Sequence, residues 1–528
     1  MERRKFLKAS AAVAAGALMS PYLSKGKDII DLKPIRSIQG FEDDKILIII
    51  ELIGGNDGLN TIIPVNNPNY YTLRPNINYP KNLAKQFGTS DLFLNPALVD
   101  NISPKNGMMK LLEEDRLAII EGIGYDNQDL SHCRSSEFWH SGLVSSDPKQ
   151  KILDGWLGRY FSSLLPTFPV EMPAEPLAIS VSGDVPLLFK STFADMGIAV
   201  QDADKFYQLG QGFANPLPTM PGTDNFLNEI NFLNIQAKQS KLYSAAVKKA
   251  YDKGKNKIKA NYSSGFSQKF KFISQLIAGG LSTKVYYVRL GNFDTHVNQM
   301  SPSHSGQHPN LLNQLATAIC EFTDDAVQLG YDKKVIGMTI SEFGRRAYEN
   351  SNSGTDHGAS SVQFVFGTNV IAGYHGNPPN LSSGLDSNGN VGIQFDYRKT
   401  YTDIMETWFG ATADESKQVF GNEFLPIGVI KPKPIGVYEN ISQFNGKNLS
   451  IGPNPSEGAC NLKFELKTAC QVRISIHSVI GAKVLEITNT FMNAGYYQIP
   501  FIIDSAGTYI CSVEADGQRF TEGFVICK

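Results

Sequence analysis

The chain has 528 residues, 42% of them hydrophobic, which is enough for a large α/β domain together with a smaller one. Its 49 lysines and arginines nearly balance its 51 acidic residues, and the formal net charge is −2. This balance gives no general attraction to nucleic acid or to an anionic membrane surface, and we expect neither as a partner.

The first 20 residues, MERRKFLKASAAVAAGALMS, are typical of an export signal rather than of a folded segment. The pair Arg3 and Arg4, followed by Phe6 and Leu7, predicts a twin-arginine signal; an ordinary secretory signal or a basic N-terminal helix are the alternatives. The apolar run is too short for a comfortable membrane span, and no later run is long enough either. We therefore expect an exported protein of the periplasm, the cell surface or the medium, without a transmembrane helix.

Apolar, β-branched runs recur through residues 40–425, and helical patterns separate several of them. Continuous runs of this kind suit strands that are covered on both faces, as in a parallel sheet. Helical spacing predicts helices at 309–330 and 398–410, and a mostly helical hairpin or cap at about 223–280. The alternation predicts an α/β domain with a mostly parallel sheet flanked by helices. The predicted strands are 45–55, 116–124, 177–183, 284–291, 334–344 and 361–367.

After about residue 425 the composition changes, and residues 426–450 have the character of a linker. Short alternating strands and turns then predict a small β-sandwich at 451–528. Four of the six cysteines fall in this segment, which in an exported module predicts at least one disulfide; buried thiols are the alternative. These cysteines are Cys460, Cys470, Cys511 and Cys527.

Metal-competent side chains come after several of the predicted strands. In an open α/β sheet, ligands bind outside the carboxyl ends of the strands, so these side chains are expected to converge at one edge. Carboxylates together with neutral imidazoles suit zinc or manganese, with magnesium or calcium as alternatives on the carboxylate-rich side. The residues that we expect to hold the metal are Asp57, Asp294, His296, Asp356 and His357.

Two ions about 4 Å apart can orient a phosphate or sulfate ester and stabilise the attacking and leaving oxygens. Ser131 is the candidate nucleophile, with Ser135 behind it, and capping of the following helix is the alternative role for both. Arg345 is expected to clamp an anionic substrate, unless it pairs with a nearby acid. Glu342 completes the catalytic set.

Four motifs in this order resemble the bacterial family called domain of unknown function fifteen-oh-one: ELIGGNDGLNTIIP, SHCRSSEFWHSG, FDTHVNQ and SEFGRRAYENSNSGTDHG. The resemblance implies an alkaline phosphatase and sulfatase superfamily fold over 40–425, with a metal ligand at Asp57 and a ligand pair at Asp356 and His357. It implies that Asp294 and His296 serve a second metal, and that one further histidine takes part, either His308 or His375.

The chain departs from that superfamily at two points. Asp294 and His296 are two residues apart instead of four, although side chains two apart on an extended segment still point the same way. There is no Cys-x-Pro-x-Arg or Ser-x-Pro-x-Arg run of the kind that sulfatases use for formylglycine. Phosphatase-like, phosphodiesterase-like and degenerate sites all remain open.

The tail resembles the C-terminal sorting domain of cargo for the type nine secretion system, on the segments NPSEGACNLKFEL, SAGTYICSVEADGQRF and FVICK. This implies a partnership with the outer-membrane secretion machinery; a carbohydrate-binding or spacer sandwich is the alternative. The sequence thus predicts an exported metal-dependent hydrolase of phosphate or sulfate esters, with a small-molecule or glycan substrate. The alternative is a non-catalytic cell-surface binding or assembly protein.

Overall fold

The computed structural model divides the chain into two units, residues 1–432 and 433–528, which are considered one at a time. The predicted signal at 1–20 and most of the predicted linker at 426–450 lie outside the residues that the structure describes. The described ranges are 33–35, 44–103, 105–169, 171–192, 194–212, 225–432, 449–466, 470–479, 482–493, 495–515 and 518–527.

The first unit is built on a nine-stranded sheet in the order β14-β5-β13-β10-β2-β9-β7-β8, with β15 also paired to β5. All its strand pairs are parallel except the two made by β13, which runs against its neighbours. The predicted, mostly parallel sheet is confirmed. The strands are β2 (Ile46–Leu52), β5 (Leu117–Gly124), β7 (Ala178–Ser180), β8 (Gly197–Ala199), β9 (Val285–Leu290), β10 (Val335–Ile340), β13 (Ser361–Phe366), β14 (Gly373–His375) and β15 (Phe395–Asp396).

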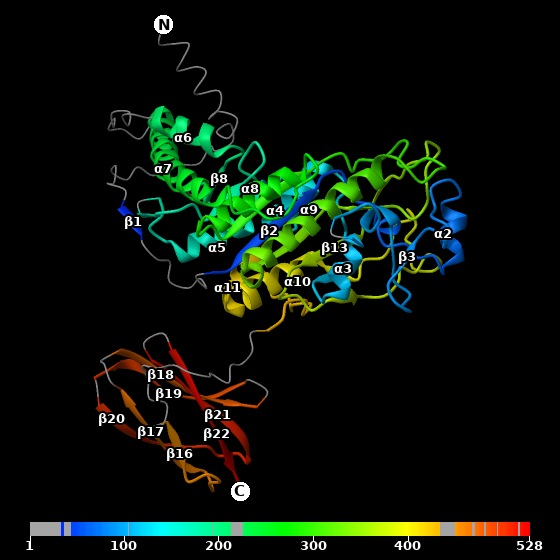
Figure 1. Cartoon of the computed structure of the whole chain (residues 1–528). Helices are drawn as coiled ribbons and strands as arrows, with labels where there is room; N and C mark the ends of the chain where they lie inside the picture. Colours follow the sequence, from blue (N-terminus) through cyan, green and yellow to red (C-terminus); the bar gives the residue numbers. More distant parts are fainter. Residues whose placement is uncertain are drawn as a thin grey trace. The chain divides into compact units, whose positions relative to one another are not determined.

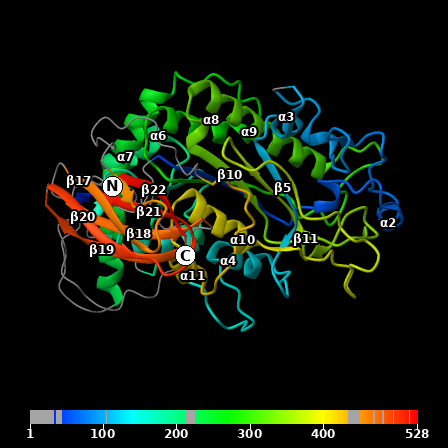
Figure 2. The same ribbon diagram turned by 90° about the horizontal axis from the view of Figure 1, so that it is seen from below.

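Two helical layers cover the sheet, and Figure 2 shows α8 and α9 on one side of β10 and β5, with α4 and α10 on the other. The central strand β2 explains both layers, because its side chains alternate between them. Ile48 and Ile50 belong to the core with α8 and α9, whereas Leu47 and Ile49 belong to the core with α4 and α5. Such a strand must be apolar throughout, and each buried aliphatic side chain stabilises the fold by roughly 1.5–3 kcal/mol.

The helices of the first unit have these bounds in the structure (Figure 1): α2 (Pro68–Leu73), α3 (Gly107–Glu113), α4 (His132–Ser141), α5 (Trp156–Leu164), α6 (Ala203–Gly212), α7 (Asn225–Gly254), α8 (Ser267–Ala278), α9 (Gln307–Leu329), α10 (Tyr397–Thr402) and α11 (Ala413–Phe420), with a π-helical turn at Asp403–Trp408. Short strands pair as β1 (Lys33–Ile35) with β6 (Glu171–Pro173), β3 (Lys85–Gln86) with β4 (Phe93–Leu94), and β11 (Gly344–Arg345) with β12 (His357–Gly358).

The predicted helical hairpin is formed by α7 and α8, and two glycines let these helices meet closely. A Cβ atom on Gly254 would lie 1.8 Å from the carbonyl oxygen of Gln275, and one on Gly279 would lie 1.9 Å from that of Ala250. Any side chain at either position would push the two helix ends apart. The hairpin is therefore specified by backbone contact as well as by its apolar face.

The second unit is the predicted small β-sandwich, with antiparallel sheets in the orders β16-β17-β20 and β19-β18-β21-β22. The expected disulfide is wrong, because all six cysteines of the chain are free thiols. Cys460, Cys470 and Cys511 are buried among apolar side chains of the sandwich core, where a thiol packs as a small hydrophobic group. The strands are β16 (Ser450–Gly452), β17 (Ala459–Leu466), β18 (Cys470–Ser478), β19 (Lys483–Met492), β20 (Gly495–Ile502), β21 (Gly507–Ala515) and β22 (Gln518–Ile526).

Within the described residues, none of the helices combines the length and the apolar character that a membrane crossing requires.

A carboxyl group buried in the sheet makes the stability of the first unit depend on pH. Glu121, on β5, is 4% exposed and accepts a hydrogen bond from the hydroxyl of Tyr374 at 3.1 Å. Burial raises the pKa of Glu121 from 4.5 to about 8. The folded state therefore holds a proton that the unfolded state releases above about pH 4.5, so this group costs stability as the pH rises toward 8.

We predict that Glu121→Gln, which is neutral at every pH, reduces the loss of stability at high pH. Between about pH 6 and about pH 9 the wild type should lose roughly 2–3 kcal/mol more than the variant. Urea unfolding followed by tryptophan fluorescence measures this for the first unit alone, because Trp139, Trp156 and Trp408 all lie in it. Parallel pH profiles for the two proteins would show that Glu121 is ionised in the fold.

Candidate metal centre

One edge of the main sheet collects the polar residues that the sequence singled out. The carboxyl ends of β2, β5, β9 and β10 meet there because these strands are parallel. Asp356 and His357 precede β13 rather than follow it, and they reach the same edge because β13 is antiparallel. The reversed strand thus contributes to the edge from its amino end.

Asp294 is the centre of a cluster in which three imidazoles turn Nε2 toward its carboxylate. Nε2 of His357 lies 3.1 Å and Nε2 of His296 lies 3.2 Å from Oδ1 of Asp294. Nε2 of His132 lies 3.6 Å from Oδ2, and the Nε2 atoms of His296 and His357 are 3.0 Å apart. We call His132, Asp294, His296 and His357 the histidine–aspartate cluster. The structure thus brings His296 and His357 to Asp294, as the sequence predicts.

The opposite nitrogen of each imidazole is held by an acceptor. Nδ1 of His132 lies 2.9 Å from Oε1 of Glu342, and Nδ1 of His296 lies 3.1 Å from Oδ1 of Asp356. Nδ1 of His357 lies 2.9 Å from the backbone carbonyl oxygen of Leu130. Metal-binding histidines nearly always have such a partner, because it fixes the tautomer and the orientation of the ring.

In a ring that carries its proton on Nδ1, the lone pair of Nε2 faces the carboxylate of Asp294. A carbonyl oxygen can only accept, so Nδ1 of His357 carries a proton and donates it to Leu130. Burial lowers the pKa of His357, so the ring is neutral and its Nε2 is a bare acceptor. Although partial burial opposes it, the hydrogen bond from Arg345 lowers the pKa of Asp294 to about 2. The carboxylate of Asp294 and the lone pair on Nε2 of His357 therefore meet at 3.1 Å.

Three of these residues are close enough to share one ion. Tetrahedral ligands near 2.0 Å from a metal lie about 3.3 Å apart, and the Nε2 atoms of His132 and His357 lie 3.6 and 3.1 Å from oxygens of Asp294. Ligand atoms of His132, Asp294 and His357 all lie within 4.8 Å of one another. The side chains of His132 and Asp294 are 39% and 46% exposed, so an ion there would be reached by solutes.

Arg345 holds the centre together from below and is not free to clamp a substrate. It is 1% exposed, and Nη2 donates to Oδ1 of Asp294 at 2.9 Å and to the carbonyl oxygen of Phe293. Nε donates to the carbonyl oxygen of Gly55 at 2.9 Å, and Nη1 donates to that of Thr355 at 2.7 Å. The alternative role, pairing with a nearby acid, is the one that the structure shows.

Gly54 allows the loop after β2 to touch the loop that carries Asp294. Its φ is +118°, a conformation that favours glycine, and a Cβ there would lie 2.2 Å from the backbone nitrogen of Asp294. Its N–H donates to Oε1 of Glu342 at 2.7 Å. Gly54 therefore contacts both the backbone of Asp294 and the side chain of Glu342, which orients His132.

Asp57 has no contact with the histidine–aspartate cluster among the described hydrogen bonds and ion pairs. Its carboxylate is buried and binds Arg74 through both oxygens, at 2.6 and 2.9 Å. Nε2 of Gln299 also donates to it at 2.5 Å. Burial opposes ionisation, but the Arg74 guanidinium keeps the pKa of Asp57 below its usual value. The carboxylate is thus already neutralised by an arginine instead of a metal.

The two candidate serines differ in their surroundings. Ser131 is exposed, sits at the N-cap of α4 beside His132, and makes no capping hydrogen bond with its side chain. Ser135 is buried, and its hydroxyl is bound by Tyr125 and by Gln128, each at 2.9 Å. Ser135 is therefore buried and fully bonded, whereas Ser131 is exposed and directly precedes His132 in the chain.

Glu342 orients His132 with one oxygen and keeps the other without a partner. Oε1 is bound as described above, whereas Oε2 is buried and has no hydrogen bond in the described part of the chain. Burial raises the pKa of Glu342. This unpaired buried oxygen is consistent with a group that holds or passes a proton at the edge of the cluster.

Neither histidine proposed as a further ligand belongs to the cluster. Nε2 of His308 lies 3.1 Å from Oδ1 of Asn56, and burial lowers its pKa to about 4. Nε2 of His375 lies 2.8 Å from the carbonyl oxygen of Ile371. The third imidazole is instead His132, which our predicted ligand set omitted. Its position next to Ser131, at the start of the helix that follows β5, was the available signal.

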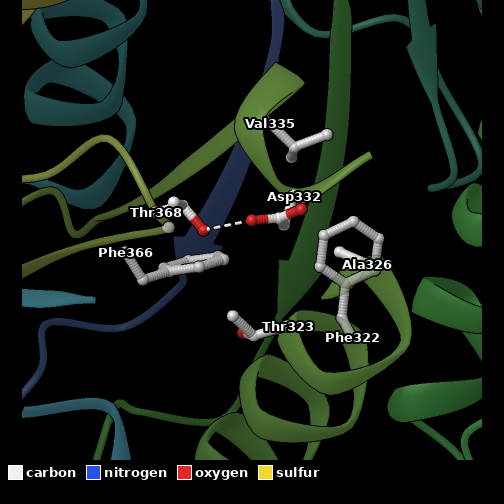
Figure 3. Close-up of a pocket in the computed structure, with 8 residues that line it drawn as sticks. Phe322, Thr323, Ala326, Asp332, Val335, Phe366 and Thr368 are labelled. Atoms are coloured by element: carbon white, nitrogen blue, oxygen red, sulfur yellow. Dashed lines mark hydrogen bonds between the residues drawn. The ribbon is translucent and has the colours of Figure 1, made fainter. Parts of the chain in front are cut away.

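A small pocket lies at the opposite edge of the sheet (Figure 3). It is bounded by Val335 at the start of β10 and by Phe366 at the end of β13, and Thr368 donates to Asp332 across it at 2.8 Å. Its volume of about 10 Å³ is room for no more than one water molecule. This pocket is therefore not a substrate site.

Comparison with solved structures gives low similarity. A protein of the alkaline phosphatase superfamily from Vibrio parahaemolyticus matches with TM-score 0.28 and 9% identity, over 89% of this chain and 85% of that one. The PsFucS1 sulfatase from Pseudoalteromonas sp. matches with TM-score 0.30 and 10% identity, over 87% and 83%. A conjugative transposon lipoprotein from Bacteroides eggerthii matches with TM-score 0.12 and 15% identity, over 15% and 95%. Likeness at this level says nothing about the chemistry of the centre.

Among curated proteins, none matches the chain. Two family models do match: "Protein of unknown function (DUF1501)" over residues 243–420 and "Secretion system C-terminal sorting domain" over residues 450–527. The first match is shorter than the range 40–425 that the motifs suggested, and it includes Asp294, His296 and His357 but not His132. The chain thus matches the first model over the region that carries most of the histidine–aspartate cluster, and the second over its C-terminal sandwich.

Proposed function

We propose that this chain is an exported, metal-dependent hydrolase of phosphate or sulfate esters, with its ion at the histidine–aspartate cluster. The observation that carries the proposal is the arrangement of the three imidazoles. Each has Nδ1 fixed by an acceptor and Nε2 turned toward the carboxylate of Asp294. With the proton of each ring on Nδ1, the Nε2 lone pairs converge on that carboxylate, an arrangement that a bound cation would stabilise.

The donor set favours zinc. Three imidazoles and one carboxylate are ligands that zinc takes readily, whereas magnesium and calcium prefer sites made of oxygen atoms. Manganese is the alternative. Because the buried carboxylate of Asp57 is taken by Arg74, the cluster supports one ion more directly than two.

The other residues of the site orient the metal ligands and supply the nucleophile and a proton-holding group. Glu342, Asp356 and the carbonyl of Leu130 orient the imidazoles, and Arg345 orients Asp294. Ser131 offers an exposed hydroxyl beside His132 as the nucleophile, and Glu342 has a buried oxygen that can hold a proton. The ion, when bound, would supply Lewis acidity toward the ester that Ser131 attacks.

The match over residues 450–527 supports export through a secretion system that reads a C-terminal sorting domain. We propose the cell surface or the medium as the place where the hydrolase acts. The twin-arginine signal proposed at residues 1–20 would take the chain across the inner membrane already folded, with its ion bound.

Removing one imidazole tests the centre. We predict about one zinc ion per chain in the purified wild type, and less than a tenth of that in His357→Ala. Hydrolysis of 4-nitrophenyl phosphate or sulfate should fall at least about 100-fold, since losing a ligand costs more than the 10–100-fold of an outer-shell change.

The control is His375→Ala, which removes an exposed imidazole outside the cluster and should leave metal and activity unchanged. Elemental analysis and initial rates are the measurements. Unchanged metal content in His357→Ala would refute the proposed site. Metal binding without hydrolysis of either ester would instead favour a non-catalytic binding protein.

The oxygen that orients His132 gives a second test. Glu342→Ala removes the acceptor for Nδ1 of His132, and zinc affinity should fall roughly 10–100-fold. Glu342→Gln keeps an acceptor oxygen at the same place and should lose much less affinity. Competition with a chromophoric chelator measures both constants. Equal affinities for the wild type and Glu342→Ala would show that His132 does not depend on Glu342.

Asp57 provides a test that separates a ligand from a structural ion pair. Asp57→Asn leaves the buried charge of Arg74 without its partner, so unfolding should become easier by about 3–5 kcal/mol. Zinc content should stay at about one ion per chain. Tryptophan fluorescence in urea and elemental analysis measure the two effects. Loss of zinc from a variant that is still folded would make Asp57 a ligand.

A further inference from the structure

Arg346 differs from every other arginine in the described part of the chain. Each of the others has a carboxylate oxygen within 4.0 Å, whereas Arg346 has none. The pairs are Arg74–Asp57, Arg116–Glu114, Arg134–Glu137, Arg159–Asp154, Arg289–Asp184, Arg345–Asp294, Arg398–Asp396, Arg473–Glu486 and Arg519–Glu514. Asp356 and Asp386 are near enough for their carboxylates to interact with the charge of Arg346, but neither forms a direct ion pair with it.

This arginine is fixed next to the histidine–aspartate cluster. Its backbone N–H donates to the carbonyl oxygen of Asp356 at 3.0 Å, and its Nε donates to that of His357 at 3.3 Å. Nη1 donates to the hydroxyl of Tyr348 at 2.8 Å. The backbone is fixed as well, because Nη2 of Arg74 binds the carbonyl oxygen of Arg346 at 2.9 Å.

The two neighbouring arginines face different surroundings. Successive side chains on an extended segment point to opposite sides, and Arg345 accordingly turns into the buried floor of the centre. Arg346 is half-buried instead, and its Nη2, which carries two N–H donors, has no hydrogen bond in the described part of the chain. A planar guanidinium of this kind recognises carboxylate, phosphate and sulfate groups.

We propose that Arg346 forms a subsite for a second anionic group of the substrate, next to the ester that is hydrolysed. This inference rests on the proposed function for the reacting ester, and it adds the class of substrate: molecules with at least two negative groups. A second phosphate, sulfate or carboxylate all offer oxygen atoms to Nη2. Arg346 therefore takes the anion-binding role that the sequence analysis assigned to Arg345.

Kinetics with a pair of substrates tests the subsite. Wild-type protein loaded with zinc should have a lower KM for a carboxylated 4-nitrophenyl phosphate than for 4-nitrophenyl phosphate itself. Arg346→Gln should raise KM for the carboxylated ester roughly tenfold or more, and leave the plain ester and kcat nearly unchanged. Arg346→Lys keeps the charge and should recover part of the difference.

Arg116→Gln is the matched control, because Arg116 is also partly exposed but lies before β5, at the opposite edge of the sheet. It should leave both KM values as in the wild type. Zinc content measured in each variant shows that the centre itself is intact. Equal effects of Arg346→Gln on both substrates would overturn the subsite and assign Arg346 a purely structural role.

A binding experiment separates this inference from the proposed hydrolysis. Calorimetry of the zinc-loaded protein with naphthalene-2-sulfonate and naphthalene-2,6-disulfonate needs no turnover. Tighter binding of the disulfonate, abolished by Arg346→Gln and kept by Arg116→Gln, supports the subsite even if no ester is hydrolysed. Equal affinity of the wild type for the two sulfonates overturns it, whether or not the chain is a hydrolase. The affinities of naphthalene derivatives that carry sulfate, phosphate or carboxylate as the second group then identify the group that Arg346 prefers.

Discussion

The buried guanidinium of Arg345 is the interaction on which the candidate centre depends. It binds carbonyl oxygens from the loops after β2 and β9 and from the loop before β13, and it also holds Asp294. These loops belong to strands that are spread over the sheet, with β13 and β9 three positions apart, roughly 14 Å. The loops must therefore lean inward over the sheet edge, and a fork of N–H donors aimed at backbone oxygens draws them together.

The centre thus has two layers with different chemistry. The lower layer is closed and charged, with Arg345 and the Arg74–Asp57 pair both almost fully buried. Buried pairs of this kind are costly to break and fix geometry more than they stabilise the fold. The upper layer is half exposed and made of imidazoles, which an ion can organise. The rigid lower layer holds the loops that carry Asp294 and His357 in place, so the cluster keeps its arrangement.

Much of the fold could be predicted from the sequence, because apolar, β-branched runs mark buried strands and helical spacing marks the layers around them. The antiparallel direction of β13 could not be predicted, because a buried strand is apolar throughout whether it runs parallel or antiparallel to its neighbours. Asp294, His296 and His357 follow from their places at strand ends. Asp57 and Arg345 were given the wrong neighbours, because the carboxylate of Asp57 is neutralised by Arg74, a residue with no distinguishing local motif. The predicted ligand set omitted His132, because its neighbour Ser131 was taken as the functional residue of that segment.

The reversed strand has a consequence for folding. Because β13 is antiparallel, the loop before it brings His357 to the same sheet edge as His132. These two residues of the cluster are more than two hundred positions apart in the sequence. No partly folded intermediate that lacks either segment can offer the whole set of donors. An ion that binds only the native arrangement would stabilise the folded state relative to the unfolded state. Occupancy of the centre would then mark a chain whose first unit has finished folding.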